Sequence, residues 1–171
     1  MADEPTREES IATLQRLIGH IRVAMMTTLH EDQMQSRPMA TTKAPFDGTL
    51  SFFTDEDTTK AEDLKRNPMV NLAYADPQRH AYISVVGEAE LLHDQAKMEE
   101  LWEDFYKTWF PKGLADPQLR LLRVNVHSAE YWDAKTRGMQ RLTGVVKEFV
   151  TGAAGGEHEH KQVDLRNSTQ R

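Results

Sequence analysis

The 171 residues suit one domain with a sizeable core, and a chain of this size often completes a site by dimerising. Asp and Glu number 27 against 21 Lys and Arg, and a net charge of −6 without a basic run excludes a typical surface for nucleic acid or an anionic membrane. No apolar run approaches a bilayer span and the acidic N-terminus differs from a signal peptide, so we expect a cytoplasmic protein. The absence of cysteine excludes disulfides and thiolate sites, so redox chemistry would need a bound cofactor.

The first part of the chain predicts a helix and two strands. Residues 5–19 are expected to form a helix, because apolar residues recur at spacings of three and four: Ile11, Leu14, Leu17 and Ile18. Val23–Leu29 and Ser36–Ala44 are predicted strands, joined by a turn over residues 30–35. Pro38 places the second strand at an edge or a bulge, since proline cannot donate a ladder hydrogen bond.

The next stretch, T-L-S-F-F-T-D-E-D-T-T-K-A-E-D-L, contains a strand followed by a short helix. Leu50–Thr54 is apolar, aromatic and β-branched, as is typical of a buried strand. Asp47-Gly48 predicts a hairpin between this strand and the preceding one. Asp57 is the expected cap of a helix over residues 58–66.

The first turn of this short helix carries two hydroxyls and a lysine, at Thr58, Thr59 and Lys60. The unpaired amides and the positive dipole end of a first turn favour a phosphate, and the lysine supplies a full charge. The alternative is an ordinary capped surface helix with a solvated lysine. The residues alone leave both interpretations open.

The second half predicts three further strands and one further helix. The strands are Met69–Tyr74, Ala81–Leu92 with a bulge at Gly87, and Leu121–Asp133 with a break at His127-Ser128. Asp94 is expected to cap a helix that reaches about Tyr106, with inward side chains at Met98, Leu101, Trp102 and Phe105. The apolar loop that follows is long enough to be a lid.

About six strands with three helices, and no regular alternation of the two, favour an antiparallel barrel over a doubly wound sheet. The fold class expected is therefore mainly β (α+β). One domain over residues 1–150 and a polar, flexible tail over residues 151–171 complete the predicted organisation. The tail histidines, His158 and His160, are a poor metal site in such a segment, and we assign no metal ligand.

Several motifs in order resemble one known superfamily. They are R-P-M at 37–39, F-F-T at 52–54, T-K-A-E-D-L at 59–64, N-P at 67–68, W-F-P-K-G at 109–113 and E-Y-W-D at 130–133. Over about residues 10–135 the chain resembles the FMN-binding split-barrel superfamily, whose best-known member is pyridoxamine 5′-phosphate oxidase, and most closely its general stress protein branch. The resemblance implies a six-stranded antiparallel split β-barrel with flanking helices.

The resemblance also implies which residues bind FMN. Those expected at its phosphate are Arg37, Thr58, Thr59 and Lys60. Phe53 and Thr54 are expected beside the flavin ring, with the backbone of Met39 to Thr42 at its pyrimidine edge. Trp132 is the candidate for a tryptophan near the ring, and Phe110 is a candidate to cover the ring from the partner chain. Arg37 could equally protect a strand edge, and Trp132 could equally be a core residue.

Three departures separate the chain from the oxidase. Thr59 stands where the oxidase has an arginine, and Thr42 stands where it has a lysine. The C-terminal segment T-R-G-M-Q-R-L-T also lacks the histidine that the oxidase uses. The resemblance therefore supports the fold and the flavin more than the vitamin chemistry, and no catalytic residue is assigned.

Three functions remain open at this point. The first is a flavin-dependent oxidoreductase that acts on a small molecule, as a homodimer with FMN between the chains. The second is a non-catalytic flavin carrier or sensor. The third is a split barrel that uses a deazaflavin or haem; the lack of histidine in the cofactor motifs counts weakly against haem.

Overall fold

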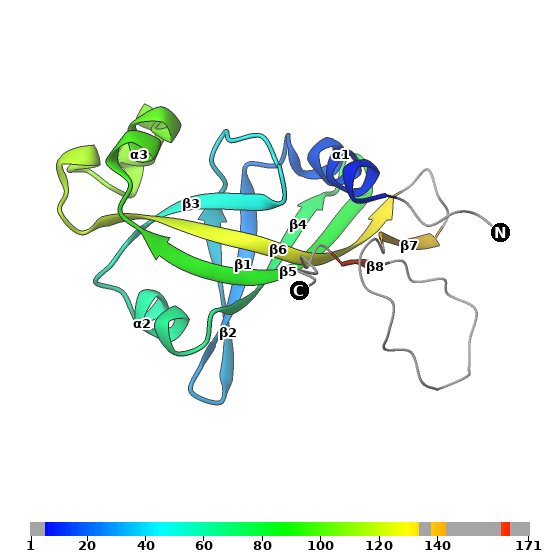
Figure 1. Ribbon diagram of the computed structural model, residues 1–171, viewed down its shortest axis with the longest axis horizontal. Helices are drawn as coiled ribbons and strands as arrows, with labels where there is room; N and C mark the ends of the chain where they lie inside the picture. The colour runs from blue at the N-terminus through cyan, green and yellow to red at the C-terminus, as the bar shows by residue number, and fades with distance from the viewer. Residues whose placement is uncertain (1–5, 134–137, 143–161, 165–171) are drawn as a thin grey trace, which may run out of the picture.

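The computed structural model describes residues 6–133, 138–142 and 162–164 (Figure 1). The helices are α1 (Arg7–Ile18), α2 (Thr59–Arg66) and α3 (Gln95–Leu101), with short 3-10 segments η1 (Asp104–Thr108) and η2 (Gly113–Ala115). The strands are β1 (Val23–His30), β2 (Gln33–Ala40), β3 (Thr49–Asp55), β4 (Met69–Asp76), β5 (Ala81–Leu92), β6 (Leu119–Asp133), β7 (Gly138–Leu142) and β8 (Gln162–Asp164). No helix among the described residues is long and apolar enough to cross a bilayer.

The six long strands form one antiparallel sheet in the order β2-β1-β4-β5-β6-β3. The two edge strands, β2 and β3, approach each other where Thr41, just after the end of β2, forms an isolated bridge with Phe52 in the middle of β3. The sheet therefore curls into a half-barrel with a split between its edges, as Figure 1 shows. This confirms the predicted mainly β split barrel and the edge position of Pro38.

The core occupies the inside of the curl, because side chains alternate across the sheet. Along β1, Ala24 and Met26 are buried, whereas Val23, Met25 and Leu29 are exposed. A capping box between Thr6 and Glu9 starts α1, whose apolar face closes one end of this core. A second cluster lies at the other end, under α3 and η1, and consists of Phe53, Met98, Leu101, Tyr106, Leu119 and Leu121.

Two predicted turns were wrong. The connection between β1 and β2 is only Glu31 and Asp32, and a positive φ of 52° at Glu31 closes it so tightly that β2 begins at Gln33. Asp47-Gly48 does not form a hairpin, since β3 pairs with β6 instead of β2. The Asp47 carboxylate accepts hydrogen bonds from the backbone amide and the hydroxyl of Thr49, which makes a local turn. This turn does not pair β3 with β2.

The register irregularity predicted at Gly87 is confirmed, although its extra residue lies in the opposite strand, and the last strand is not broken at His127-Ser128 as predicted. β6 runs without interruption, and its register against β5 shifts because Gly87 pairs with Val126 while Val86 pairs with Ser128. His127 is thus the extra residue of a bulge. A Cβ at Gly87 would lie 2.4 Å from the Asn125 carbonyl oxygen, so the close strand approach requires glycine.

The third helix is shorter than predicted. Asp94 caps it as expected, but α3 ends at Leu101 and the chain continues in η1. Phe105, predicted to point inward, is 42% exposed. The boundary at residue 150 and most of the tail lie outside the described residues; within the tail, β8 pairs with β6.

Candidate functional site

A groove of about 230 Å³ lies at the split between the two edge strands. Because β2 and β3 meet only at the Thr41–Phe52 bridge among the described residues, their facing backbone groups beyond it have no strand partner. The start of α2 and the segment around η1 supply the other walls. The lining residues are Val23, Pro38, Met39, Ala40, Phe53, Thr54, Asp55, Thr58, Lys60, Tyr106, Trp109 and Phe110.

Thr58, and not the predicted Asp57, caps α2 at one end of the groove. The Thr58 hydroxyl accepts a hydrogen bond from the Ala61 amide at 3.2 Å and donates one to the Asp55 carbonyl at 3.1 Å. The extended backbone of Thr58 (φ −134°, ψ 148°) is the geometry that a cap requires. The first-turn amides of Thr59 and Lys60 lack intrahelical acceptors and remain available to an anion.

Lys60 brings a positive charge into the groove. Burial first, and the nearby Arg37 guanidinium second, lower the pKa of Lys60 to about 8, although Asp55 opposes this. The Lys60 Nζ lies 3.4 Å from the Met39 sulfur, a weak acceptor. The lysine is therefore a poorly compensated cation, and an anionic ligand would supply the missing partner.

Arg37 is held beside this cation without lining the groove. Its Nη1 donates a hydrogen bond to the Thr28 hydroxyl at 2.8 Å, and its Nη2 donates one to the Gln35 side chain at 3.3 Å. Arg37 and Met39 share the inner face of β2, two residues apart. Two cations thus converge near the α2 N-terminus.

Asp55 is the one carboxyl among the residues that line the groove. Burial and the neighbouring Asp116 carboxyl raise the pKa of Asp55, while Lys60 and Lys112 oppose that rise. The two lysines are thus the neighbours that stabilise its ionised form.

The other end of the groove is aromatic. Phe53 packs against Trp102 and Tyr106, with ring centroids 5.2 and 4.9 Å away, while Phe110 and the half-exposed Trp109 line the groove beyond them. The buried Tyr106 hydroxyl lies 3.4 Å from the Thr41 carbonyl oxygen, and burial raises the pKa of Tyr106 to about 12, so this phenol is neutral at pH 7. A flat ring system with apolar faces would fit this wall.

Six of the ten predicted site residues line this groove: Met39, Phe53, Thr54, Thr58, Lys60 and Phe110. Arg37 and Thr59 lie next to it, with the Thr59 side chain exposed to solvent. Phe110, expected from a partner chain, reaches the groove of its own chain.

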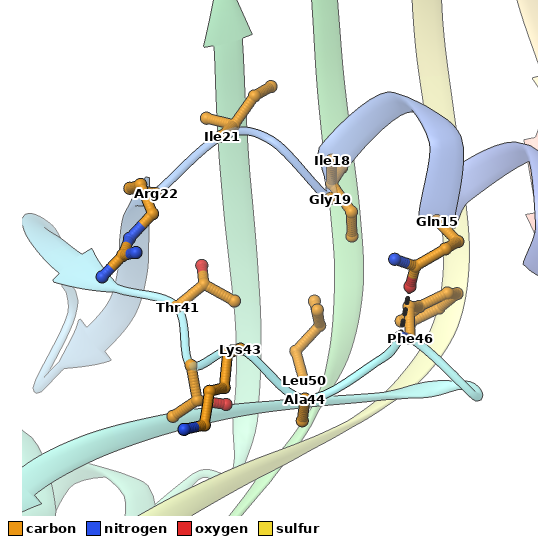
Figure 2. Close-up of a pocket in the computed structure, with 11 residues that line it drawn as sticks. Gln15, Ile18, Gly19, Ile21, Arg22, Thr41, Lys43, Ala44, Phe46 and Leu50 are labelled. Carbon is orange, nitrogen blue, oxygen red and sulfur yellow. Dashed lines mark hydrogen bonds between the residues drawn. The ribbon is translucent and has the colours of Figure 1, made fainter. Parts of the chain in front are cut away.

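The remaining two predicted residues lie elsewhere in the chain. Thr42 lines a second cavity of about 180 Å³ between α1 and the segment after β2, and its hydroxyl is buried without a partner. Figure 2 shows this cavity. Gln15 borders this cavity, and its side-chain carbonyl accepts a hydrogen bond from the Phe46 amide. Trp132 pairs with Tyr82 near the end of β6, whereas Leu119, at the start of that strand, pairs with Asp55 beside the groove.

Asp55 and Tyr106 line the groove but are not among the site residues predicted from the sequence. Asp55 directly follows the predicted strand Leu50–Thr54 and lies three positions before the expected site at residues 58–60. Tyr106 was placed at the end of a long helix, and its contact with Phe53 depends on the shorter α3. Among the described residues no three histidine, aspartate or glutamate side chains gather as a metal site.

Comparisons with known proteins find curated relatives of this chain. Protein bli-3 of Neurospora crassa is 24% identical over 156 residues, which cover 85% of this chain and 75% of that protein. General stress protein 26 of Bacillus subtilis is 26% identical over 113 residues, which cover 63% of this chain and 77% of that protein.

Solved structures share the fold. A protein related to general stress protein 26 from Clostridium acetobutylicum has a TM-score of 0.64 at 26% identity, covering 74% of this chain and 90% of that one. The general stress FMN/FAD binding protein of Xanthomonas citri has a TM-score of 0.64 at 21% identity, covering 86% of this chain and 99% of that one. The sequence profile described as "Pyridoxamine 5'-phosphate oxidase like" matches residues 9–155, and the chain belongs to this family.

Proposed function

We propose that this protein binds FMN in the groove and is a flavin-dependent oxidoreductase of the general stress protein type. The observation that carries the proposal is the undercompensated Lys60 at the α2 N-terminus, directly beside an aromatic wall. That arrangement suits a ligand with a phosphate at one end and a flat ring at the other. The fold relative from Xanthomonas citri, described as an FMN/FAD binding protein, adds support.

The residues present fit such a cofactor. Lys60 and the first-turn amides of α2 would hold the phosphate, while Phe53 and Phe110 would contact the ring. The unpaired edge of β2 near Met39 and Ala40 offers backbone donors and acceptors to the ring's polar edge. Bound flavin supplies hydride chemistry, and the chain's contribution is to orient the ring and exclude water.

We further propose a homodimer with the cofactor between the chains. A groove of about 230 Å³ is below the roughly 300–1,000 Å³ typical of pockets that enclose such ligands, so one chain would leave much of FMN exposed. Val23 lines the groove and also belongs to the outer face of the sheet. This face carries further exposed apolar side chains at Met25, Leu29, Met34, Met69, Tyr82 and Trp132. A second copy on this face would bury it and could bring Trp132 to the partner's ring.

A non-catalytic flavin carrier or sensor is the second candidate. It is favoured by the makeup of the groove, since the described lining residues include no histidine and offer only Asp55, Lys60 and the high-pKa Tyr106 as titratable groups. The same lack of histidine disfavours a haem ligand there. A deazaflavin would use the same walls, and the cofactor that copurifies distinguishes it from FMN.

The absorbance spectrum of the purified protein tests the proposal. Flavin bands that bleach on photoreduction, return with oxygen and also bleach with a hydride donor would support the oxidoreductase. Bound flavin that no donor reduces would support the carrier. Protein that neither copurifies with flavin nor binds added FMN would refute both.

A further inference from the structure

Asp63 is a buried carboxyl on the helix that begins the proposed phosphate site. It lies one turn after Lys60, and its side chain is only 2% exposed on the face of α2 that also buries Ala61 and Leu64. A buried carboxyl is costly unless it is paired. Its Oδ1 lies 2.7 Å from Nδ1 of His30, and its Oδ2 is buried without a hydrogen-bond partner.

His30 ends β1 and shares one face of that strand with Thr28. The Thr28 hydroxyl accepts the hydrogen bond from Arg37, so two neighbouring side chains of β1 hold two different parts of the site. His30 holds α2 through Asp63, and Thr28 holds the guanidinium of Arg37. The relative position of Lys60 and Arg37 is therefore set through β1.

The two cations need such a restraint because they repel each other. Arg37 contributes to the lowered pKa of Lys60, which records this repulsion. Without a bound anion, repulsion would favour movement of the α2 N-terminus away from β2. Among the described contacts, the His30–Asp63 pair is a polar bond that joins α2 directly to β1.

We propose that His30 and Asp63 form a positioning pair that holds the α2 N-terminus at the phosphate of the cofactor. The pair touches no ligand and acts through the placement of Lys60. This inference rests on the proposed function, because it assigns the pair to the phosphate end of that same groove.

The affinity ratio of FMN to riboflavin tests this role, since riboflavin lacks the phosphate. We expect His30→Gln and Asp63→Asn each to raise the FMN dissociation constant about tenfold, because small misplacements of a positioned group are costly. Riboflavin affinity should change less than about twofold in both variants. The double variant should be no worse than the single ones, because the pair acts as a unit.

His20 offers a matched control. Its Nε2 lies 2.9 Å from Asp76 Oδ2, so it forms the same kind of pair, and it lies beyond the opposite end of β1. His20→Gln should leave the FMN-to-riboflavin ratio unchanged. An equal change of the ratio in this variant would show a general effect of stability and would overturn the positioning role.

The remaining outcomes separate this inference from the proposed function. Wild-type protein that binds FMN more tightly than riboflavin, with variants that keep that ratio or weaken both ligands alike, would overturn the positioning role alone. Wild-type protein that does not distinguish FMN from riboflavin would overturn the phosphate site, and the positioning role with it.

Discussion

Lys60 is the residue on which the proposed site most depends. Its ammonium group is partly buried between a guanidinium and a thioether, with Asp55 as the opposing charge. An apo protein gains nothing from such an arrangement, because burial and repulsion both disfavour the charge. A ligand phosphate would reverse this balance, which makes the lysine a direct reporter of the proposed function.

Lys60→Met should weaken FMN binding by about 1–3 kcal/mol, the range for loss of one charge-assisted hydrogen bond. Riboflavin binding should remain nearly unchanged. Lys65→Met, on the same helix but exposed and paired with Glu56, is the control that should affect neither ligand. Equal loss of both ligands in the Lys60 variant would place the lysine away from the phosphate.

The pH dependence of FMN binding should follow the protonation of Lys60. The pKa of Lys60 is about 8 in the folded protein, against 10.5 for an ordinary lysine. Between pH 8 and 10.5 the unfolded chain therefore binds more protons than the folded one, and the free energy of unfolding of the protein without FMN should rise with pH. FMN affinity should instead fall above pH 8, because the free protein loses the ammonium charge that the phosphate favours. Titration calorimetry and urea unfolding of wild type and Lys60→Met measure both effects. A variant with the wild-type pH profile would contradict the assignment.

At the scale of elements, the site depends on where α2 begins. The chain leaves β3 at Asp55, and Thr58 closes the first turn by bonding to both Ala61 and Asp55. Thr58 is therefore occupied as a cap, whereas Thr59 exposes its side chain beside the first-turn amides. The two threonines, predicted together as phosphate ligands, have different local roles.

Thr58→Ala should lower the free energy of unfolding by about 1 kcal/mol, the typical cost of a lost N-cap, and should weaken FMN binding because the first turn frays. Thr59→Ala should leave stability nearly unchanged. Thermal and urea unfolding without ligand, followed by FMN titration, give both quantities. Equal stability of the two variants would argue against the cap.

At the scale of the whole molecule, the open sheet creates both the groove and an apolar outer face. The groove exists because β2 and β3 do not pair beyond one bridge, and the outer face exposes Met25 next to Ala73 and Tyr82 next to Trp132. These features adjoin at Val23, which lines the groove and is itself 43% exposed. A homodimer on this face would link assembly to cofactor binding.

The protein should sediment as a dimer whose melting temperature rises with added FMN, because ligand binding to the folded dimer stabilises it by mass action. Met25→Asp should produce a monomer with reduced FMN affinity, since a charge at a buried apolar contact is costly. Met34→Asp, at the 82% exposed side chain near the β1–β2 turn, tests the edge of the face. A stable wild-type monomer that binds FMN with full affinity would refute the shared site.

Turnover of pyridoxamine 5′-phosphate should be absent or slow. By the resemblance, Thr42 stands where the oxidase has a lysine, and it lines a separate cavity. The segment T-R-G-M-Q-R-L-T has no histidine to match the one that the oxidase uses. Oxygen uptake with this substrate should remain well below about 1 per second, the lower end of common enzyme rates. Faster turnover would show that other residues supply the chemistry.

The sequence by itself determined the six long strands and three helices, the edge position of Pro38, the register irregularity at Gly87 and the short helix carrying Lys60; β7 and β8 were not predicted. These features follow from local periodicity, proline and glycine chemistry and a recognisable order of motifs. Turn geometry was less predictable, because Glu31-Asp32 closes a hairpin through one positive φ and Asp47-Gly48 forms a turn that joins no strand pair.

Only the tertiary structure decided which residues meet at the groove. Pairing of β3 with β6 instead of β2 is a contact between segments about 70 residues apart, and no local pattern encodes it. That pairing leaves the split between β2 and β3, and Tyr106 and Phe110 lie beside Phe53 there. Thr42 and Trp132 lie outside the groove within one chain. The physical reason is that the choice of strand partners depends on how the complete sheet buries its apolar side chains. A sequence pattern indicates only whether one segment favours the strand conformation and which of its residues share a face.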